Sequence, residues 1–329
     1  MSMQGIILAA GKGTRLQPVT PARTKAMAPV AGKPIVARVF DLFVQNGIRD
    51  ILLLISPDDR DIQPYFERYL QSACAGLQGI DEVTVKFVVQ QERLGMAHAL
   101  TLLAPYIHGN FLMSACDNLV PTAHIAALID KQRTEQANAV LSLMAIDIAQ
   151  SATTGIVAFD QTGNWIQRIV EKPQPAEAPS NIASLPLYVF THKLLDYLPR
   201  VQPSARGEYE LQDAIQMMIE DAGRVTGVQT AERWQLTNVD DLLELNRHYL
   251  TAEPDQGVNH GGQQGDPVRI VPPVRIDPGV QIGERCVIGP NVYIEADCRI
   301  ENDCLLQNCI LLQGATLAAS SEVIDKVVL

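Results

Sequence analysis

The sequence predicts an α/β domain built on a mainly parallel sheet, followed by a short parallel β-helix. From residue 1 to about residue 145, short apolar runs alternate with segments that have the period of a helix. Such alternation is typical of βαβ units, in which helices cover both faces of the sheet. From residue 268 onward, apolar residues recur at every sixth position, which indicates a parallel β-helix.

Composition narrows the class of protein. The 329 residues allow two or three domains, and 47% hydrophobic with 19% charged residues is typical of a globular chain. The net charge of -11 argues against nonspecific binding to nucleic acid or anionic membranes, because both require clustered Lys and Arg. The N-terminus lacks the basic region of a signal peptide, and no apolar run approaches a membrane span, so we expect a cytoplasmic protein.

The turn after the first apolar run is the first candidate site. Residues 6–9 are expected to form a short buried strand, and Gly11 and Gly13 follow it. Successive N–H groups in a glycine-rich turn form a concavity that attracts anions, and Arg15 and Lys25 add positive charge. The spacing is neither that of a P-loop nor that of a dinucleotide fingerprint. An ordinary strand-to-loop turn with solvated charges is the alternative.

Five apolar or periodic segments complete the first half of the chain. Residues 51–55, 83–89 and 111–113 are predicted strands, and 36–44 and 96–103 are predicted helices. Ligands of open α/β sheets bind beyond the carboxyl ends of the strands. Polar residues that follow these strands are therefore candidate site residues.

Two strand ends carry such residues. Gln90 offers a donor and an acceptor that could read the edge of a pyrimidine, and Gly95 would let the backbone approach the base. A polar strand cap and a helix-start glycine are the alternative. Asp117 could bind Mg²⁺, which needs one or two carboxylates together with substrate phosphates. Its alternative role is to cap a turn or helix, which Asn118 could do as well.

Residues 146–232 predict a second set of strands and helices. Glu171 and Lys172 end one of these strands as a carboxylate beside an ammonium group, a pair suited to the hydroxyls and phosphate of a sugar phosphate. A surface ion pair is the alternative. Strands are expected at 155–159, 165–173 and 184–190, and an amphipathic helix that stops at a glycine is expected at 207–223.

The segment 233–250 is expected to form a strand followed by a helix. Asp240 lies at their junction and is a candidate metal ligand, with Asn238 as the second choice. The alternative is that Asp240 is the N-cap of the helix. Residues 251–267 are rich in Gly, Gln and Pro without apolar periodicity, which predicts a linker.

The hexad pattern that follows has two apolar phases. Helices and plain strands cannot produce a period of six. No His occurs from Val268 onward, and no C-x-x-C motif occurs anywhere, so we expect six reduced and mostly packed thiols. The first phase is Ile270, Ile276, Ile282, Ile288, Ile294, Ile300, Leu306, Leu312, Ala318 and Ile324; the second is Val268, Val274, Val280, Cys286, Val292, Cys298, Cys304 and Ile310.

The stretch LAAGKGTRLQPVT, Lys25 and the following PVAGKP together resemble the signature of sugar-1-phosphate nucleotidylyltransferases, notably glucose-1-phosphate thymidylyltransferases and UDP-sugar pyrophosphorylases. The EKP sequence that begins at Glu171 is similar to the sugar site of that family. The repeat resembles left-handed β-helices, with roughly three coils. The resemblance implies a Rossmann-like nucleotidyltransferase domain at 1–250, with a mixed and mostly parallel sheet, a linker at 251–267 and a left-handed β-helix at 268–329.

The resemblance also implies a reaction and its residues. An NTP, with dTTP or UTP favoured over GTP and CTP, and a hexose 1-phosphate, with glucose 1-phosphate favoured, would give an NDP-sugar and pyrophosphate with Mg²⁺ as cofactor. The implied roles are catalysis for Arg15, Lys25 and Lys172; nucleotide binding for Leu8, Ala9, Ala10, Gly11, Gly13, Thr14, Gln90 and Gly95; sugar binding for Gly155 and Glu171; and metal binding for Asp117 and Asp240.

The sequence departs from the family pattern at two places. Cys116 precedes Asp117 where the family has Gly. Ser184-Leu185-Pro186 replaces a small triplet whose Asn binds the sugar, and Asn181 lies three residues too early to take that role.

Two alternatives to the nucleotidylyltransferase reading follow from the same family. A noncatalytic regulatory subunit would have lost charged site residues, yet Arg15, Lys25, Asp117 and Lys172 are all present. A bifunctional enzyme with acyltransferase activity in the β-helix would use a His there, and the repeat has none. We expect instead that the β-helix serves assembly into a homo-oligomer, because its open ends expose strand edges.

Overall fold

The computed structural model describes residues 3–11, 13–17, 19, 23–71, 79–253 and 268–329. They form two compact units. The first unit comprises Met1–Gly11 and Val36–Arg233, and the second comprises Lys12–Ile35 and Trp234–Leu329. The loop after the first strand therefore clusters with the C-terminal part of the chain. The domain boundaries at 250 and 268 stay a prediction, and most of the predicted linker lies outside the described residues.

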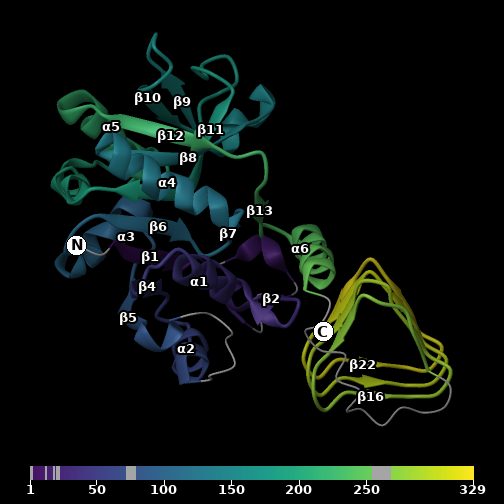
Figure 1. The fold of residues 1–329 in the computed structure, drawn as a ribbon. Coiled ribbons are helices and arrows are strands. Elements are labelled where there is room, and N and C mark those ends of the chain that lie inside the picture. Colours follow the sequence, from purple (N-terminus) through teal and green to yellow (C-terminus); the bar gives the residue numbers. More distant parts are fainter. Residues whose placement is uncertain (1–2, 12, 18, 20–22, 72–78, 254–267) are drawn as a thin grey trace. The chain divides into compact units, whose positions relative to one another are not determined.

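A nine-stranded sheet forms the centre of the first unit (Figure 1). Strands β1, β4, β5 and β6 are parallel to one another, which confirms the arrangement predicted for the first half of the chain. Strand β11 pairs antiparallel with β6, β8 and β9, so the complete sheet is mixed. The strands are β1 (Gln4–Ala9), β4 (Asp50–Ile55), β5 (Thr84–Val89), β6 (Phe111–Ala115), β8 (Ala139–Ala145), β9 (Gly155–Phe159), β10 (Ile166–Glu171), β11 (Ile182–Phe190) and β12 (Val225–Gln229).

Helices pack on both faces of this sheet, as predicted. Gly5 of β1 faces α1 so closely that a Cβ there would lie 2.7 Å from a ring atom of Phe43. Its neighbour Ile6 points to the opposite face, where it packs in one core cluster with buried residues of α3 and α5. The helices are α1 (Ile35–Gln45), α2 (Ile62–Gln71), α3 (Met96–Leu103), α4 (Thr122–Glu135) and α5 (Leu211–Ala222). None of the described helices is long and apolar enough to cross a membrane.

The expected helix at 207–223 starts later than its pattern suggested. Its first four residues form a turn in which Gly207 has a φ of 75°, a conformation that favours glycine. The helix begins at Leu211 and stops at Gly223, where the sequence placed the stop. The other predicted helices and strands are observed within a few residues of their expected bounds.

Outside the β-helix, the second unit consists of short elements and one helix. Its loop contains the 3₁₀ turns η1 (Thr14–Leu16) and η2 (Lys25–Met27) and a small hairpin of β2 (Pro29–Val30) and β3 (Lys33–Pro34). Strand β13 (Trp234–Gln235) precedes helix α6 (Val239–Ala252), and the short strand β7 (Asn118–Leu119) belongs to the first unit.

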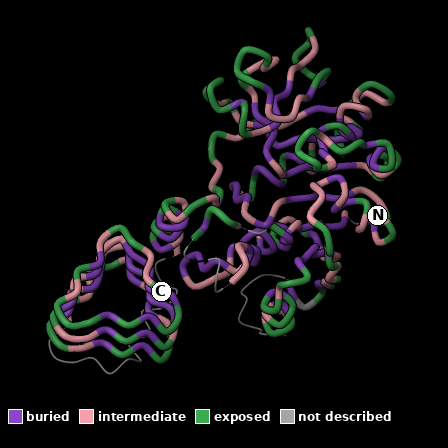
Figure 2. Tube along the Cα trace, turned by 180° about the vertical axis from the view of Figure 1, so that it is seen from behind, coloured by how far each residue is buried: buried purple, intermediate pink, exposed green. Residues whose placement is uncertain are grey.

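The C-terminal residues wind into a left-handed parallel β-helix with three sides (Figure 1). Buried residues recur along its sides and exposed residues at its corners (Figure 2), and Cys286, Cys298, Cys304 and Cys309 are among the buried ones. One side holds β14 (Arg269–Ile270), β17 (Val287–Ile288), β20 (Leu305–Gln307) and β23 (Glu322–Ile324); the second holds β15 (Val274–Ile276), β18 (Val292–Ile294), β21 (Cys309–Leu311) and β24 (Val327–Val328); the third holds β16 (Gln281–Ile282), β19 (Arg299–Ile300) and β22 (Thr316–Leu317).

The strict hexad register predicted from the sequence is wrong in the last coil. The earlier coils have 18 residues, because Ile270 pairs with Ile288 and Ile288 with Leu306. Leu306 then pairs with Val323, 17 residues on. One hexad near Asn308, which has a φ of 46°, is therefore one residue short. From there the interior positions are Cys309, Leu311, Ala315, Leu317 and Val323, in place of Ile310, Leu312, Ala318 and Ile324.

This shift can be tested with a pair of adjacent substitutions. Leu317 is 6% exposed and Ala318 is exposed. We expect Leu317→Asp to lower the free energy of unfolding by at least about 2 kcal/mol, since it removes buried apolar surface and places a carboxylate in the core. Ala318→Asp should change it by no more than about 0.5 kcal/mol. Urea unfolding followed by circular dichroism measures both, and the reverse order of effects would restore the strict register.

Candidate functional site

The carboxyl ends of β1 and β6 lie side by side in the first unit. Leu8 pairs with Ala115, and the Cys116 N–H donates to the Leu8 carbonyl at 3.1 Å. The chain then leaves β1 through Ala9, Ala10 and the exposed Gly11, and it leaves β6 through the half-buried Asp117. Parallel pairing thus places the predicted metal ligand on the strand next to the predicted phosphate-binding turn.

Arg93 is a residue of this edge that the sequence pattern did not single out. Its guanidinium donates from Nε to the Ala10 carbonyl at 2.6 Å and also contacts Ser56, which follows β4. The side chain therefore bridges the ends of two neighbouring strands and holds the first residue after β1 in place. Only its charge near a predicted strand end could have drawn attention to it.

A second missed contact lies beside Asp117. The Arg233 guanidinium donates from Nε to Asn118 Oδ1 at 2.7 Å. The other atom of that amide, Nδ2, is buried without a hydrogen-bond partner among the described residues. Buried amides are normally paired, so this donor is one of the few polar groups in the unit whose hydrogen bonding is incomplete.

Gln90 and Gly95 follow β5, as the sequence predicted. Gln90 is 5% exposed, and its Nε2 lies 3.2 Å from His98 Nδ1. Gly95 has a φ of 100°, and a Cβ there would lie 2.5 Å from the Tyr209 carbonyl oxygen. The structural reason for this glycine is therefore the close approach of the backbone at Tyr209. A contact of either residue with a base stays a prediction.

Gly155, Glu171 and Lys172, the candidates for sugar and sugar-phosphate contact, gather where β9 begins and β10 ends. Gly155 of β9 pairs with Glu171, the last residue of β10, and on its other side with Ser184 of β11. A Cβ at Gly155 would lie 3.3 Å from Glu171 Oε2 and from the side chain of Gln212. Lys172 has a φ of 48° and its Nζ lies 3.0 Å from Glu171 Oε1.

In the folded chain, Arg206 and Gln212 also lie beside Gly155 and Glu171, although the sequence did not single them out. The Arg206 guanidinium lies 3.4 Å from Glu171 Oε1 and 2.7 Å from Glu210 Oε1, and the hydrogen bond to Glu210 raises the pKa of Arg206. Gln212 is 4% exposed. Both come from the turn and helix that follow residue 203. The only sequence signal for Arg206 is a cation next to the glycine turn before α5.

Two acceptor atoms of this cluster lack hydrogen bonds. Glu171 Oε2 and Gln212 Oε1 are buried, and within the described part of the chain neither has a partner. Leaving a buried acceptor unpaired is costly, so such atoms point to a ligand or water that completes the site. Burial also raises the pKa of the nearby Tyr188, which keeps its hydroxyl protonated. The cluster thus offers two cations and one carboxylate to a small polar ligand.

The second unit holds the other predicted residues of the glycine-rich loop. Gly13 has a φ of 64° and precedes η1, in which Thr14 and Arg15 are exposed and Leu16 is fully buried. Leu16 anchors the turn while Arg15 projects outward. Lys25 is half-buried and is the first residue of η2.

The structure of the junction before α6 contradicts the interpretation of Asp240 as the helix N-cap. The N-cap is Asn238, whose Oδ1 accepts from the Asp241 N–H at 3.0 Å, while Asp241 Oδ2 accepts from the Asn238 N–H. Asp240 as the N-cap is therefore wrong, and its exposed carboxylate takes no part in the capping box. Asn238 uses its oxygen in the cap, which leaves Asp240 the better candidate of the two for a metal.

The donor set fits a magnesium site completed by substrate. Among the described residues, no group of three or more His, Cys, Asp or Glu side chains is placed to hold a metal ion. Asp117 supplies a hard oxygen donor at a strand end, next to the turn expected to hold phosphates. Mg²⁺ accepts one or two carboxylates with phosphate oxygens and water, so the carboxylate of Asp117 fits the ion.

Two family models match the sequence. The model described as "Nucleotidyl transferase" matches residues 4–252, and the model described as "GMPPB C-terminal domain" matches residues 270–329. The first match covers the predicted turn, strand-end and sugar-site residues, and the second covers the β-helix.

Similar curated proteins carry the names of sugar nucleotide enzymes. The chain is 32% identical over 235 residues to "UTP--glucose-1-phosphate uridylyltransferase AglF" of Haloferax volcanii, which covers 71% of this chain and 90% of that protein. It is 31% identical over 249 residues to "Bifunctional protein GlmU" of Methanococcus maripaludis, which covers 75% of this chain. The chain spans only 54% of that bifunctional protein.

Solved structures give the same fold. A UDP-glucose pyrophosphorylase complexed with UDP-glucose superposes with a TM-score of 0.68 at 20% identity and covers 77% of this chain and 100% of that one. A UTP-bound UGPase from Acinetobacter baumannii gives 0.67 at 25% identity, over 79% of this chain and 97% of that one. The family match and the AglF relative together show that this chain is a nucleotidyltransferase and belongs to the nucleotidyl transferase family.

Proposed function

We propose that the chain transfers a nucleotidyl group from UTP or dTTP to a hexose 1-phosphate, with glucose 1-phosphate as the preferred acceptor, and releases pyrophosphate. The observation that carries this proposal is the cluster around Gly155. A buried carboxylate oxygen without a hydrogen bond lies beside two cations there, which suits the hydroxyls and the phosphate of a sugar phosphate. The names of the relatives support the choice of uridine or thymidine nucleotide and of glucose.

In this mechanism the sugar phosphate oxygen attacks the α-phosphorus of the nucleotide. The protein contributes position and charge, because no covalent intermediate is needed. Lys172 holds the attacking phosphate, and Arg206 adds a second cation near it. Glu171 accepts from sugar hydroxyls, and the lack of a Cβ at Gly155 leaves room for the ring.

The nucleotide is assigned to the glycine-rich loop and the strand ends. The backbone at Gly11 and Gly13 binds the phosphates, while Arg15 and Lys25 offset the charge on the departing pyrophosphate. Gln90 reads the base. Asp117, with Asp240 as the second carboxylate, would hold Mg²⁺, which would supply neutralisation of phosphate charge when bound.

A pyrophosphate-release assay over a grid of NTPs and sugar 1-phosphates tests the proposed reaction. We expect release with UTP or dTTP and glucose 1-phosphate, with the addition of EDTA abolishing it and Mg²⁺ restoring it. Asp117→Asn should raise the Mg²⁺ concentration needed for half-maximal rate, because one anionic ligand is lost. No release with any pair would instead favour the noncatalytic reading.

The role of Lys172 can be tested against a lysine outside this cluster. Lys172→Ala should lower kcat/KM at least about 100-fold, which corresponds to about 3 kcal/mol, the usual cost of removing one preorganised donor. Lys193 lies in the 3₁₀ segment His192–Asp196 and is exposed, so Lys193→Ala is the matched control and should leave the rate unchanged. Equal rates for the two variants would remove Lys172 from the mechanism.

Self-association is a further part of the proposal. We expect the β-helix to join copies of the chain, because a solenoid this short leaves backbone groups of its terminal strands unpaired. Sedimentation velocity of the full chain should give a species larger than the 36.0 kDa monomer. A monomer at all accessible concentrations would refute this role for the β-helix.

A further inference from the structure

A salt bridge joins the glycine-rich loop to the β-helix within the second unit. The Arg23 guanidinium donates to both carboxylate oxygens of Glu295, from Nη1 at 2.8 Å and from Nη2 at 2.9 Å. The two side chains are 18% and 12% exposed. Bidentate pairs of this kind fix orientation as well as distance, and partial burial protects them from screening by salt.

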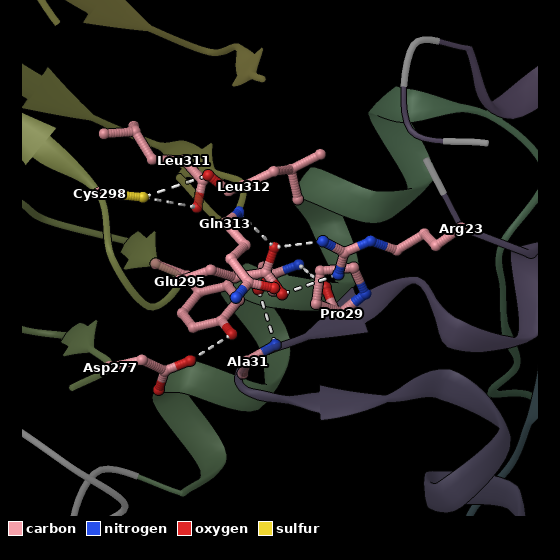
Figure 3. Close-up of polar contacts among 11 residues, drawn as sticks. Arg23, Pro29, Ala31, Asp277, Glu295, Cys298, Leu311, Leu312 and Gln313 are labelled. Atoms are coloured by element: carbon pink, nitrogen blue, oxygen red, sulfur yellow. Dashed lines mark hydrogen bonds and ion pairs between the residues drawn. The ribbon is translucent and has the colours of Figure 1, made fainter. Parts of the chain in front are cut away.

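The β-helix fixes the carboxylate of Glu295 through contacts that do not involve Arg23. Glu295 follows β18, and its Oε2 accepts from the Gln313 N–H of the next coil at 2.9 Å (Figure 3). The Glu295 N–H donates to the Leu311 carbonyl at 2.9 Å. Stacked coils therefore fix both the backbone and the side chain of this residue, and Arg23 contacts a preorganised acceptor.

Two more contacts fix the other end of the same loop segment. The Asn246 side chain of α6 accepts from the Ala31 N–H at 2.7 Å and donates to the Pro29 carbonyl at 3.2 Å. At Gly32, where φ is 80°, a Cβ would lie 2.0 Å from Arg275 Nε of the β-helix. Arg275 is held in turn by Asp277 at 3.0 Å.

Lys25 lies between these two attachments. It comes two residues after Arg23 and opens η2, in which the Met27 N–H donates to the Thr24 carbonyl and the Ala28 N–H donates to the Lys25 carbonyl. A segment this short, fixed at both ends, leaves its central residues little conformational freedom. The position of the Lys25 backbone thus depends on residues of the β-helix.

We infer that Arg23 and Glu295 are positioning residues for the nucleotidyl transfer: the β-helix holds the Lys25 segment in its working conformation through this salt bridge. The inference rests on the proposed function, in which Lys25 offsets charge on the departing pyrophosphate. It gives the β-helix a part in turnover within a single chain, in addition to the proposed role in assembly.

The first test compares two substitutions that each remove one bidentate salt bridge from the β-helix. Glu295→Gln removes the charge that holds Arg23. Asp303→Asn is the matched control, because Asp303 makes its bidentate pair, at 2.7 and 2.9 Å, with Arg285 of the β-helix and not with a loop residue. Full-length wild type and both variants are assayed for pyrophosphate release, for NTP binding by calorimetry and for thermal unfolding.

Glu295→Gln should lower kcat and weaken NTP binding, with a fall in kcat/KM for the NTP of about ten- to 100-fold, since a misplaced catalytic group costs rate steeply. The KM for the sugar 1-phosphate should stay unchanged, because Glu171 and Lys172 belong to the first unit and the substitution leaves their own contacts intact. Asp303→Asn should leave kcat and the KM values for both substrates unchanged. Equal kinetic losses in both variants would show a merely structural effect and overturn the inference.

The second test asks whether Glu295 acts through Lys25. In a Lys25→Ala background, Glu295→Gln should cause no further loss in kcat/KM, because the group that it positions is already gone. Additive losses would overturn the inference. The proposed function fails separately, by a wild type that releases no pyrophosphate or by a Lys25→Ala variant with a normal rate, whatever Glu295→Gln does.

Discussion

The position of β1 in the sheet is the constraint on which the rest of this structure depends. This strand is hydrogen-bonded on one side to β4 and on the other to β6. Its residues Ile6 and Ile7 are fully buried, so the strand cannot shift without exposing core on both faces. The end of the strand at Ala9 and Ala10 is therefore fixed. The glycine-rich turn, which begins with the next residue, Gly11, continues from a backbone that cannot move. Arg93 reinforces that end by binding the Ala10 carbonyl.

Incomplete hydrogen bonding marks the cluster at the end of β10. Glu171 is held by Lys172 and Arg206 through one oxygen while the other oxygen stays unpaired. The arrangement costs free energy in the absence of a ligand, and a hydroxyl donor would recover it. The fixed end of β1 and the unpaired acceptor at β10 have complementary parts in the proposed function. The first would fix the position of the phosphates, and the second favours a ligand that carries hydrogen-bond donors.

The spacing of apolar residues predicted the helices and strands well, because the burial of one face of each element imposes that spacing. The helix at 96–103 and the strand at 155–159 have their predicted bounds, since apolar spacing and flanking glycines both mark them. The shortened hexad escaped prediction because Leu311 and Leu312 are both apolar and satisfy either register. Site residues next to a strand end could be found from the sequence, whereas Arg206 could not, because folding brings it to Glu171 across 35 residues. The close approach of the Tyr209 backbone to Gly95 could not be predicted either, because it joins segments far apart in the sequence.

The salt bridge between Arg23 and Glu295 has a consequence for how the chain matures. Its partners are 272 positions apart in the sequence. During synthesis from the N-terminus, the sheet of the first unit can form long before Glu295 leaves the ribosome, whereas the loop around Lys25 must wait for the last coils. Contacts of such large sequence separation are closed late, after local structure has formed. A truncated nascent chain would thus carry a finished sheet and a loop that lacks this salt bridge, so the loop gains its anchor only near the end of translation.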